Sequence, residues 1–264
     1  MHSDAQIAAI ADWIIGEHAA GRRYQPLPAT HAIDRLDDAY RVQALLPDTW
    51  VASRGALAGY KIALTSKPIQ ELCGVDQPIA GRLYAKTIQS GPATISLNSF
   101  GRLGLEFELA VRLAAPLPAT DGPWTSDNVR PYVASIAPAF ELIEDRNADY
   151  GSLDACSMIA DNAWSGGVIL GQEVSHFQTL DLANMPVTLT LNGQTETSVT
   201  GAAMGNPLTG LAWIANLLNS QDKALQSGDL VITGSTLATR FANAGDTACY
   251  QIAGLGDVEL SITD

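Results

Sequence analysis

The spacing of apolar residues predicts helices at the start of the chain. Between residues 5 and 20, the apolar residues that share one helical face are Ile7, Ile10, Ala11 and Ile14. We expect Asp4 to cap the N-terminus of this helix and Gly21 to end it. A loop with two prolines follows, and a second helix is expected over residues 32–46.

From residue 57 onward, the hydrophobic pattern becomes that of strands. Strands are expected at residues 57–64, 105–113, 136–143, 230–233, 248–252 and 258–262. Two alternating runs near 187–199 flank Asn192-Gly193, a dipeptide typical of a type I′ hairpin turn. Asn206-Pro207 is expected to open one further helix, which runs to about Asn219.

This order of elements predicts an α+β fold. A small N-terminal α region should pack on a large, mostly antiparallel β core. We divide the chain into an N-terminal α/β region, residues 1–88, and a β-rich catalytic core, residues 89–264, which together form one compact unit. The Gly/Pro/Ser-containing stretch 89–98 is the candidate linker.

Composition narrows the class of protein. The chain has 264 residues, of which 47% are hydrophobic, and a formal net charge of −13. That charge argues against nucleic acid or an anionic membrane surface as a partner. Three widely spaced cysteines without a CxxC motif indicate reduced thiols and a cytoplasmic location. The N-terminus lacks the basic start of a signal peptide, and no apolar run is long enough to span a membrane.

The most informative segment is residues 105–111, Leu-Glu-Phe-Glu-Leu-Ala-Val. Because side chains alternate along a strand, Glu106 and Glu108 share one face and the large apolar residues occupy the other. Positions two apart in a strand are separated by roughly 6.6 Å, so the two carboxylates can converge on one cation. For this pair alone, a solvent-facing strand edge with two charges is the simpler interpretation.

A third glutamate lies where a charge is rare. Glu141 is inside the apolar run 138–143, and a glutamate in such a run is seldom buried unless it is paired or coordinated. Glu106, Glu108 and Glu141 are therefore candidate ligands of one metal ion. Ligation by oxygen alone favours Mg²⁺ or Mn²⁺ over zinc.

Lys61 is the candidate acid–base group. It shares a strand face with two small residues, Gly59 and Ala63, which leaves room for a ligand. A desolvated lysine has a lowered pKa and can exchange a proton near neutral pH, whereas an outward-pointing lysine is merely solvated. The four histidines all lie outside these segments, which counts against a Ser-His-Asp triad and against a His-ligated zinc.

A series of short motifs follows in order along the chain. They are residues 39–43 (AYRVQ), 59–66 (GYKIALTS), 74–78 (GVDQP), the Glu106/Glu108 pair, 140–146 (FELIEDR), 159–163 (IADNA), 205–207 (GNP), 212–216 (AWIAN) and 227–235 (SGDLVITGS). In these residues the chain resembles the 2-hydroxypentadienoate hydratase and 4-oxalocrotonate decarboxylase branch of the fumarylacetoacetate hydrolase superfamily. Each motif is modest alone, but their order and spacing together are specific.

The resemblance implies a mixed β-roll core, Mg²⁺ or Mn²⁺ at the three glutamates, Lys61 beside the substrate, and a homo-oligomer. The implied substrate is a short 2-oxo or 2-hydroxy-dienoate acid from aromatic ring cleavage. A divalent ion can chelate the C1 carboxylate and C2 oxygen of such an acid and stabilise its enolate. The candidate substrate-binding residues are Thr65, Ile79, Arg82, Arg146, Asn162, Ser235 and Thr236.

Two positions depart from the family's pattern. Hydratases of this type usually have an acid one residue after the proline of the GVDQP-like motif, where this chain has Ile79. A basic residue is common two positions before the first metal glutamate, where this chain has Gly104, with Arg102 nearby. Asp76 and Asp161 are the candidate catalytic groups that would replace the missing distal acid.

Four functions remain open on these observations. The first is a metal-dependent lyase that adds water to a 2-hydroxy-2,4-dienoate. The second is decarboxylation of a 2-oxo-3-enedioate, which the apolar Ile79 would favour. Hydrolysis of an acylpyruvate is a third, but no histidine is placed to activate water. An inactive metal-binding paralogue or partner subunit is the fourth, and retention of Lys61 and all three glutamates weighs against it.

Overall fold

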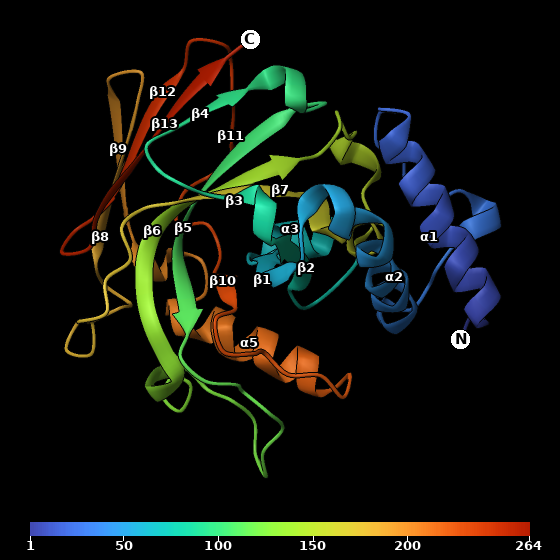
Figure 1. The fold of residues 1–264 in the computed structure, drawn as a ribbon, viewed down its shortest axis with the longest axis horizontal. Helices are drawn as coiled ribbons and strands as arrows, with labels where there is room; N and C mark the ends of the chain where they lie inside the picture. Colours follow the sequence, from blue (N-terminus) through green and yellow to red (C-terminus); the bar gives the residue numbers. More distant parts are fainter.

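The two N-terminal helices lie together at one end of the molecule, and a long later helix lies apart from them below the strands (Figure 1). The computed structural model describes residues 1–264. The helices are α1 (Asp4–Ala19), α2 (Leu36–Arg54), α3 (Lys67–Leu72), α4 (Ala155–Ala160) and α5 (Pro207–Asn219). No helix combines the length and the apolar character that crossing a bilayer requires.

The first helix begins one residue earlier than its predicted cap implies. Ser3, not Asp4, is the N-cap: its hydroxyl accepts a hydrogen bond from the backbone N–H of Gln6, and the Gln6 side chain accepts one from the backbone N–H of Ser3. Asp4 lies in the first turn, where its negative charge complements the helix dipole.

The second helix differs more from the prediction, because α2 begins at Leu36 and continues through Pro47 to Arg54. A proline inside a helix removes one backbone hydrogen bond. Leu46 and Trp50 are buried on either side of it in a cluster with α1, and this packing stabilises the additional turns. Gly55, at a φ of 85°, ends the helix.

Two mixed sheets make up the rest of the fold. The eight-stranded sheet has the order β2-β1-β10-β5-β6-β7-β3, with β11 also paired to β5. Its strands are β1 (Leu57–Ala63), β2 (Ile79–Tyr84), β3 (Ile88–Ser90), β5 (Leu103–Leu113), β6 (Val133–Glu144), β7 (Ser165–Leu170), β10 (Leu230–Ile232) and β11 (Arg240–Phe241). The pairs β1–β10 and β3–β7 are parallel, and the other pairs are antiparallel.

The second sheet has five strands in the order β4-β13-β12-β8-β9. They are β4 (Ala93–Ser96), β8 (Pro186–Leu191), β9 (Gln194–Val199), β12 (Thr247–Ile252) and β13 (Gly256–Thr263). The predicted type I′ hairpin joins β8 and β9, with both Asn192 and Gly193 at positive φ. The predicted α+β fold on mixed, mostly antiparallel sheets is confirmed.

The expected boundary after residue 88 remains a prediction. The candidate linker 89–98 contains most of β3 and all of β4, which belong to different sheets. Strands β1 and β2 come from the N-terminal side of that boundary, yet they complete the eight-stranded sheet beside β10. Any division of the chain at this point therefore passes through one continuous sheet.

The main core lies between the two sheets. On the inner face of β5 and β6, Phe107 and Phe140 pack edge-on to each other and contact Tyr250 of β12, with ring centroids 5.8 to 6.3 Å apart. Because side chains alternate along a strand, the residues between these aromatics point away from this core. Those residues include Glu106, Glu108 and Glu141.

Candidate metal centre and active site

The three predicted glutamates converge on the outer face of β5 and β6. Glu106 lies directly opposite Glu141 in the antiparallel register, and Glu108 lies opposite Ala139. One carboxylate oxygen from each glutamate is within 4.8 Å of those of the other two. Glu108 and Glu141 are fully buried, whereas Glu106 is only partly buried. The two strands thus bring three carboxylates together, two of them away from water.

Two of these carboxylates are held by groups from the loop between β10 and β11. The Gly234 backbone N–H donates to Glu108 Oε2 at 2.7 Å, and the Thr239 hydroxyl donates to Glu106 Oε1 at 2.6 Å. Gly234 has a φ of 107°, a conformation that favours glycine. This loop therefore packs around the acidic cluster and fixes the orientation of Glu106 and Glu108.

Lys61 reaches the same cluster from β1. Its Nζ lies 2.8 Å from Glu141 Oε1, at the distance of an ion pair but without good hydrogen-bond angles, and only 1% of the residue is exposed. Gly81, its partner on β2, makes room for the lysine stem. A Cβ at Gly81 would lie 3.0 Å from Lys61 Cγ and 2.6 Å from the Asn162 carbonyl oxygen.

The predicted lowering of the Lys61 pKa is wrong. Burial lowers the pKa of Lys61, but the charges of Glu141 and Glu106 outweigh burial and leave the pKa raised. For Glu108, burial first and then the charges of Glu141 and Glu106 raise the pKa well above its usual range. Burial also raises the pKa of Glu141, against the lowering effect of Lys61. Lys61 is therefore a protonated side chain that pairs with an anionic cluster.

The cluster fits a divalent cation on chemical grounds. Glu108 Oε1 and Glu141 Oε2 are buried without a hydrogen-bond partner, which is costly for carboxylates. When all three carboxylates are ionised they carry a charge of −3 and Lys61 carries +1, so a divalent ion would bring the sum to zero. Oxygen ligands in this number suit a hard ion and leave positions for water and substrate.

A cavity of about 380 Å³ opens beside the cluster. Of the predicted site residues, those that line it are Lys61, Thr65, Glu106 and Ser235. The Ser235 hydroxyl is already engaged, since it accepts from the Phe107 backbone N–H at 3.0 Å and donates to the Leu237 carbonyl at 2.8 Å. Glu108 and Glu141 do not line the cavity, because both are fully buried behind its wall. Their carboxylate oxygens nevertheless lie within 4.8 Å of an oxygen of Glu106.

Three predicted residues lie together elsewhere. Asp161, Arg146 and Asn162 line a larger cavity of about 760 Å³, which includes none of the three candidate metal ligands. Asp161 is paired with Arg146 and with His18, and the Asn162 side chain bonds to the backbone of Arg82. Burial raises the pKa of Asp161, but His18 and Arg146 outweigh it and lower the pKa. These groups join the N-terminal helices to the sheet.

The remaining predicted residues do not line the glutamate cavity. Asp76 is exposed in the loop after α3, at a separate surface hollow. Arg82 neighbours Gly81 on β2 and so projects to the face opposite Lys61. Ile79 is fully buried in the cluster with α2 and α4, although its pairing partner Ala63 lines the cavity. The Thr236 hydroxyl is buried and donates to the Phe107 carbonyl.

Sequence reasoning missed several lining residues. Thr239, Tyr150 and Trp164 all line the cavity. Tyr150 donates from its hydroxyl to Asp145 at 3.2 Å, and its ring packs edge-on against Trp164, with the ring centroids 5.9 Å apart. Trp164 also lines the larger cavity, so it stands between the two. These residues come from loops without a periodic pattern, and only Trp164 adjoins a motif, residues 159–163.

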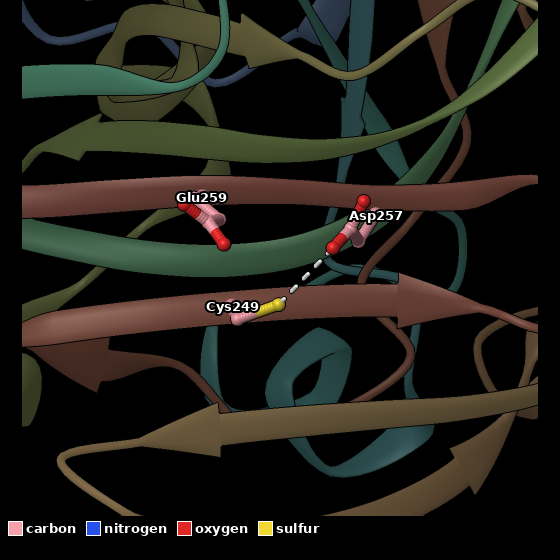
Figure 2. Close-up of side chains that lie close together, drawn as sticks. All are labelled: Cys249, Asp257 and Glu259. Carbon is pink, nitrogen blue, oxygen red and sulfur yellow. Dashed lines mark hydrogen bonds between the residues drawn. The ribbon is translucent and has the colours of Figure 1, made fainter.

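A second acidic group lies on the five-stranded sheet. Cys249 of β12 and Asp257 and Glu259 of β13 present their side chains close together, as Figure 2 shows. Both acids are exposed, so water solvates their charges, in contrast to the buried glutamates. Burial and the neighbouring Asp257 raise the pKa of the Cys249 thiol, which disfavours the thiolate that metals prefer.

Comparison with known proteins identifies the family of the chain. The family model described as "Fumarylacetoacetate (FAA) hydrolase C-terminal" matches residues 64–263. A 2-hydroxyhexa-2,4-dienoate hydratase from Comamonas testosteroni is 30% identical over 249 residues, 93% of each chain. A 2-keto-4-pentenoate hydratase from Burkholderia vietnamiensis is 30% identical over 265 residues, 100% of each chain.

A solved structure is also similar over nearly the whole chain. It is the 4-oxalocrotonate decarboxylase from Pseudomonas putida G7, complexed with magnesium and adipate, with 25% identity, a TM-score of 0.90 and 99% of each chain covered. The family match covers Glu106, Glu108 and Glu141, and the shared fold extends over nearly the whole chain. The chain therefore belongs to the fumarylacetoacetate hydrolase family, on the branch that contains 2-keto-4-pentenoate hydratases.

Proposed function

We propose that this protein is a metal-dependent lyase that adds water to a 2-hydroxy-2,4-dienoate. The observation that carries the proposal is the convergence of Glu106, Glu108 and Glu141 with Lys61 at a cavity. The hydratase names of the relatives support this reaction over others in the family. Aromatic-compound breakdown, which generates such dienoates, is the metabolic setting that the sequence resemblance implies.

The three glutamates would hold Mg²⁺ or Mn²⁺. The magnesium named for the related decarboxylase supports that choice, as does ligation by oxygen atoms alone. When bound, a divalent ion at this site supplies positive charge that stabilises an anionic oxygen of the substrate. The protein supplies the rest: the β10–β11 loop orients Glu106 and Glu108, and the nearby apolar wall limits the entry of water.

Lys61 is the group that we assign to proton delivery or substrate anion binding, both of which suit a lysine whose pKa is raised by Glu141 and Glu106 against the effect of burial. Hydration places a proton on one carbon of the distal double bond and a hydroxyl group on the other, so one group must deliver or relay that proton. The titratable side chains that line the cavity are Lys61, Glu106 and Tyr150. Asp76 and Asp161 lie outside it and would act only through other groups.

Decarboxylation of a 2-oxo-3-enedioate is the second candidate function. The apolar Ile79, buried behind the cavity wall at Ala63, supplies no acid for hydration. Cleavage to CO₂ requires no distal acid in its bond-breaking step and proceeds more easily in apolar surroundings. The similarity to a decarboxylase along the whole chain supports this alternative.

The two functions are separated by incubating the magnesium-loaded protein with a dienoate and with an enedioate and identifying the products by mass. We expect the dienoate to gain one water, with ¹⁸O from labelled water found in the product. Release of CO₂ from the enedioate without hydration of the dienoate would instead identify a decarboxylase.

We also propose a homo-oligomer that works in the cytoplasm. All three cysteines are free thiols, which suits a reducing compartment. Sedimentation of the purified protein tests the first statement, and a molar mass of one chain would contradict it.

A further inference from the structure

We infer that the larger cavity is a second ligand site, which binds a doubly charged oxyanion such as a phosphate ester or a dicarboxylate. The cavity lies between the C-terminal ends of α1 and α2, the loop between β4 and β5, and the segment 161–164 that joins α4 to β7. None of the three candidate metal ligands lines it, so binding there does not depend on the proposed function. The charge of the lining, its free hydrogen-bond donors and its size carry the inference.

The lining is basic although the protein as a whole is strongly acidic. Four of the chain's 15 lysines and arginines meet at this one cavity, in a chain whose formal net charge is −13. Besides His18, the charged side chains of the lining are Arg22, Arg23, Arg54 and Arg146 against Glu144 and Asp161. A local excess of positive charge in a hollow attracts an anion despite the general repulsion.

Arg54 is the arginine of this group that most lacks a counter-ion. Arg22 and Arg146 pair with Glu17 and Asp161, whereas no carboxylate lies within ion-pairing distance of Arg54. Its guanidinium carbon lies 3.9 Å from the ring centroid of Trp50, a cation–π contact that fixes its position at the cavity. Burial lowers the pKa of Arg54 more than the charges of Tyr84 and Asp161 raise it. A partly desolvated guanidinium in this state gains a charge-assisted hydrogen bond from a bound oxyanion.

Uncharged donors stand ready beside the arginines. Asn98, Ser99 and Ser165 line the cavity, and their side chains make no hydrogen bond within the protein. Ser165 is buried, so its hydroxyl is a donor fixed at the base of a hollow. Arginine, hydroxyl and amide groups together are the donors that phosphate and carboxylate oxygens accept from.

The size of the cavity indicates an organic anion. Its volume of about 760 Å³ is twice the roughly 380 Å³ of the cavity beside the glutamates, and both lie in the range of ~300–1,000 Å³ typical of small-molecule sites. Phe100 and Trp164 are in the lining and offer apolar surface to the body of such a molecule. We therefore expect an organic anion to bind more tightly than an inorganic one of the same charge.

The wall between the two cavities gives the second site a route to the first. Asn162, Ala163 and Trp164 have φ angles of 55°, 47° and 57°, a conformation that is costly for residues other than glycine. Trp164 lines both cavities, and its indole N–H is buried without a partner. Because both features cost free energy, a ligand on one side can shift this wall. We expect the bound anion to alter the cavity beside the glutamates.

Binding is tested by calorimetry on the magnesium-loaded protein at low ionic strength, with inorganic phosphate, AMP and succinate as probes and acetate as the singly charged control. We expect at least one of the three probes to bind once per chain, at least tenfold more tightly than acetate. Preference for AMP identifies a phosphate ester, and preference for succinate a dicarboxylate. No saturable binding of any probe at millimolar concentration, or equal binding of acetate, would overturn the inference.

Variants locate the bound anion. Arg54→Gln should raise Kd tenfold or more, the scale of one lost charged hydrogen bond. Arg23→Gln, at an exposed position where the core is not disturbed, should also weaken binding. The matched control is Arg35→Gln, because Arg35 is exposed and pairs with Asp37 outside the cavity. Binding should also change tryptophan fluorescence, since Trp50 and Trp164 line the site. Wild-type affinity in both Arg54→Gln and Arg23→Gln would overturn the assignment.

The effect on the other cavity is measured as kcat/KM for hydration of a dienoate, with and without a saturating concentration of the tightest probe. This measurement rests on the proposed function, whereas the binding measurements do not. We expect a change of about fivefold or more, the lower end of typical coupling between sites, and its loss in Arg54→Gln. An unchanged kcat/KM with the anion bound would overturn the coupling through Trp164. If no dienoate is hydrated, the proposed function fails, and the binding results alone decide the inference.

Discussion

Glu106 and Glu141 lie directly opposite each other on the antiparallel strands β5 and β6. Like charges in this position destabilise a sheet, and here Glu108 adds a third. The sheet would be more stable with one of these acids replaced, so their presence together indicates that the arrangement has a function. The pairing therefore points to a bound cation, and Lys61 offsets only one of the three charges.

Thr239 is expected to tune the affinity of the metal site without being a ligand. Its hydroxyl holds Glu106 in one orientation, and loss of such a partner typically weakens metal binding 10–100-fold. Thr239→Val should show this loss in calorimetric titration with Mn²⁺, while Thr239→Ser, which keeps the hydroxyl, should bind nearly as the wild type. Unchanged affinity in Thr239→Val would mean that this hydrogen bond is incidental.

Lys61 is expected to act in the chemistry. Lys61→Met should lower kcat by ~10²-fold or more, the usual scale for a lost acid–base group. Lys67→Met is the matched control, because Lys67 is exposed a few residues further along and should leave the rate unchanged. A raised KM with unchanged kcat would instead show that Lys61 only binds the substrate.

The acidic cluster should destabilise the metal-free fold. Glu108→Gln replaces a buried carboxyl group that repels its two neighbours whenever it is ionised, so the chelated variant should melt at the same or a higher temperature than chelated wild type. Added Mg²⁺ should then raise the melting temperature of the wild type more than that of the variant. Glu259→Gln, in the exposed acidic group of Figure 2, should change neither value. A large loss of stability in Glu108→Gln would contradict this account.

Asp161 is expected to make the fold sensitive to acid. Its pKa is lowered in the folded state by His18 and Arg146 against the effect of burial, so its stabilising contribution is complete above the unfolded pKa, about 4, and is lost as pH falls through the folded pKa. At neutral pH, Asp161→Asn should cost roughly 3–5 kcal/mol of unfolding free energy, because Arg146 loses a buried partner. Denaturant melts at several pH values should show this difference shrinking below about pH 4. A constant difference would exclude this linkage.

Several elements of the fold could be predicted from the sequence, and others could not. Alternation in β5 and the Asn192-Gly193 turn depend on neighbouring residues alone, and both were expected. Strands β2 and β7 are buried on both faces and therefore lack alternation. The continuation of α2 past Pro47 depends on contacts with α1, which no local pattern records.

The candidate site, too, could be predicted from the sequence only in part. The three glutamates were expected because two share a strand face and the third lies in an apolar run. The raised pKa of Lys61 was not expected, because it depends on Glu141, which lies 80 positions away in the chain but 2.8 Å away in space. The positions of Asp161, Arg146 and Asn162 in a separate cavity likewise follow from packing against the N-terminal helices.

The central claim is that Glu106, Glu108 and Glu141 hold a divalent ion on which hydration depends. The most direct measurement is turnover of 2-hydroxypenta-2,4-dienoate by protein stripped with a chelator and then titrated with Mg²⁺ or Mn²⁺. We predict no turnover in the stripped protein, recovery that saturates at one ion per chain, and no recovery in Glu141→Gln with its fold intact by circular dichroism. Full turnover in rigorously stripped wild type, or normal recovery in Glu141→Gln, would contradict the claim.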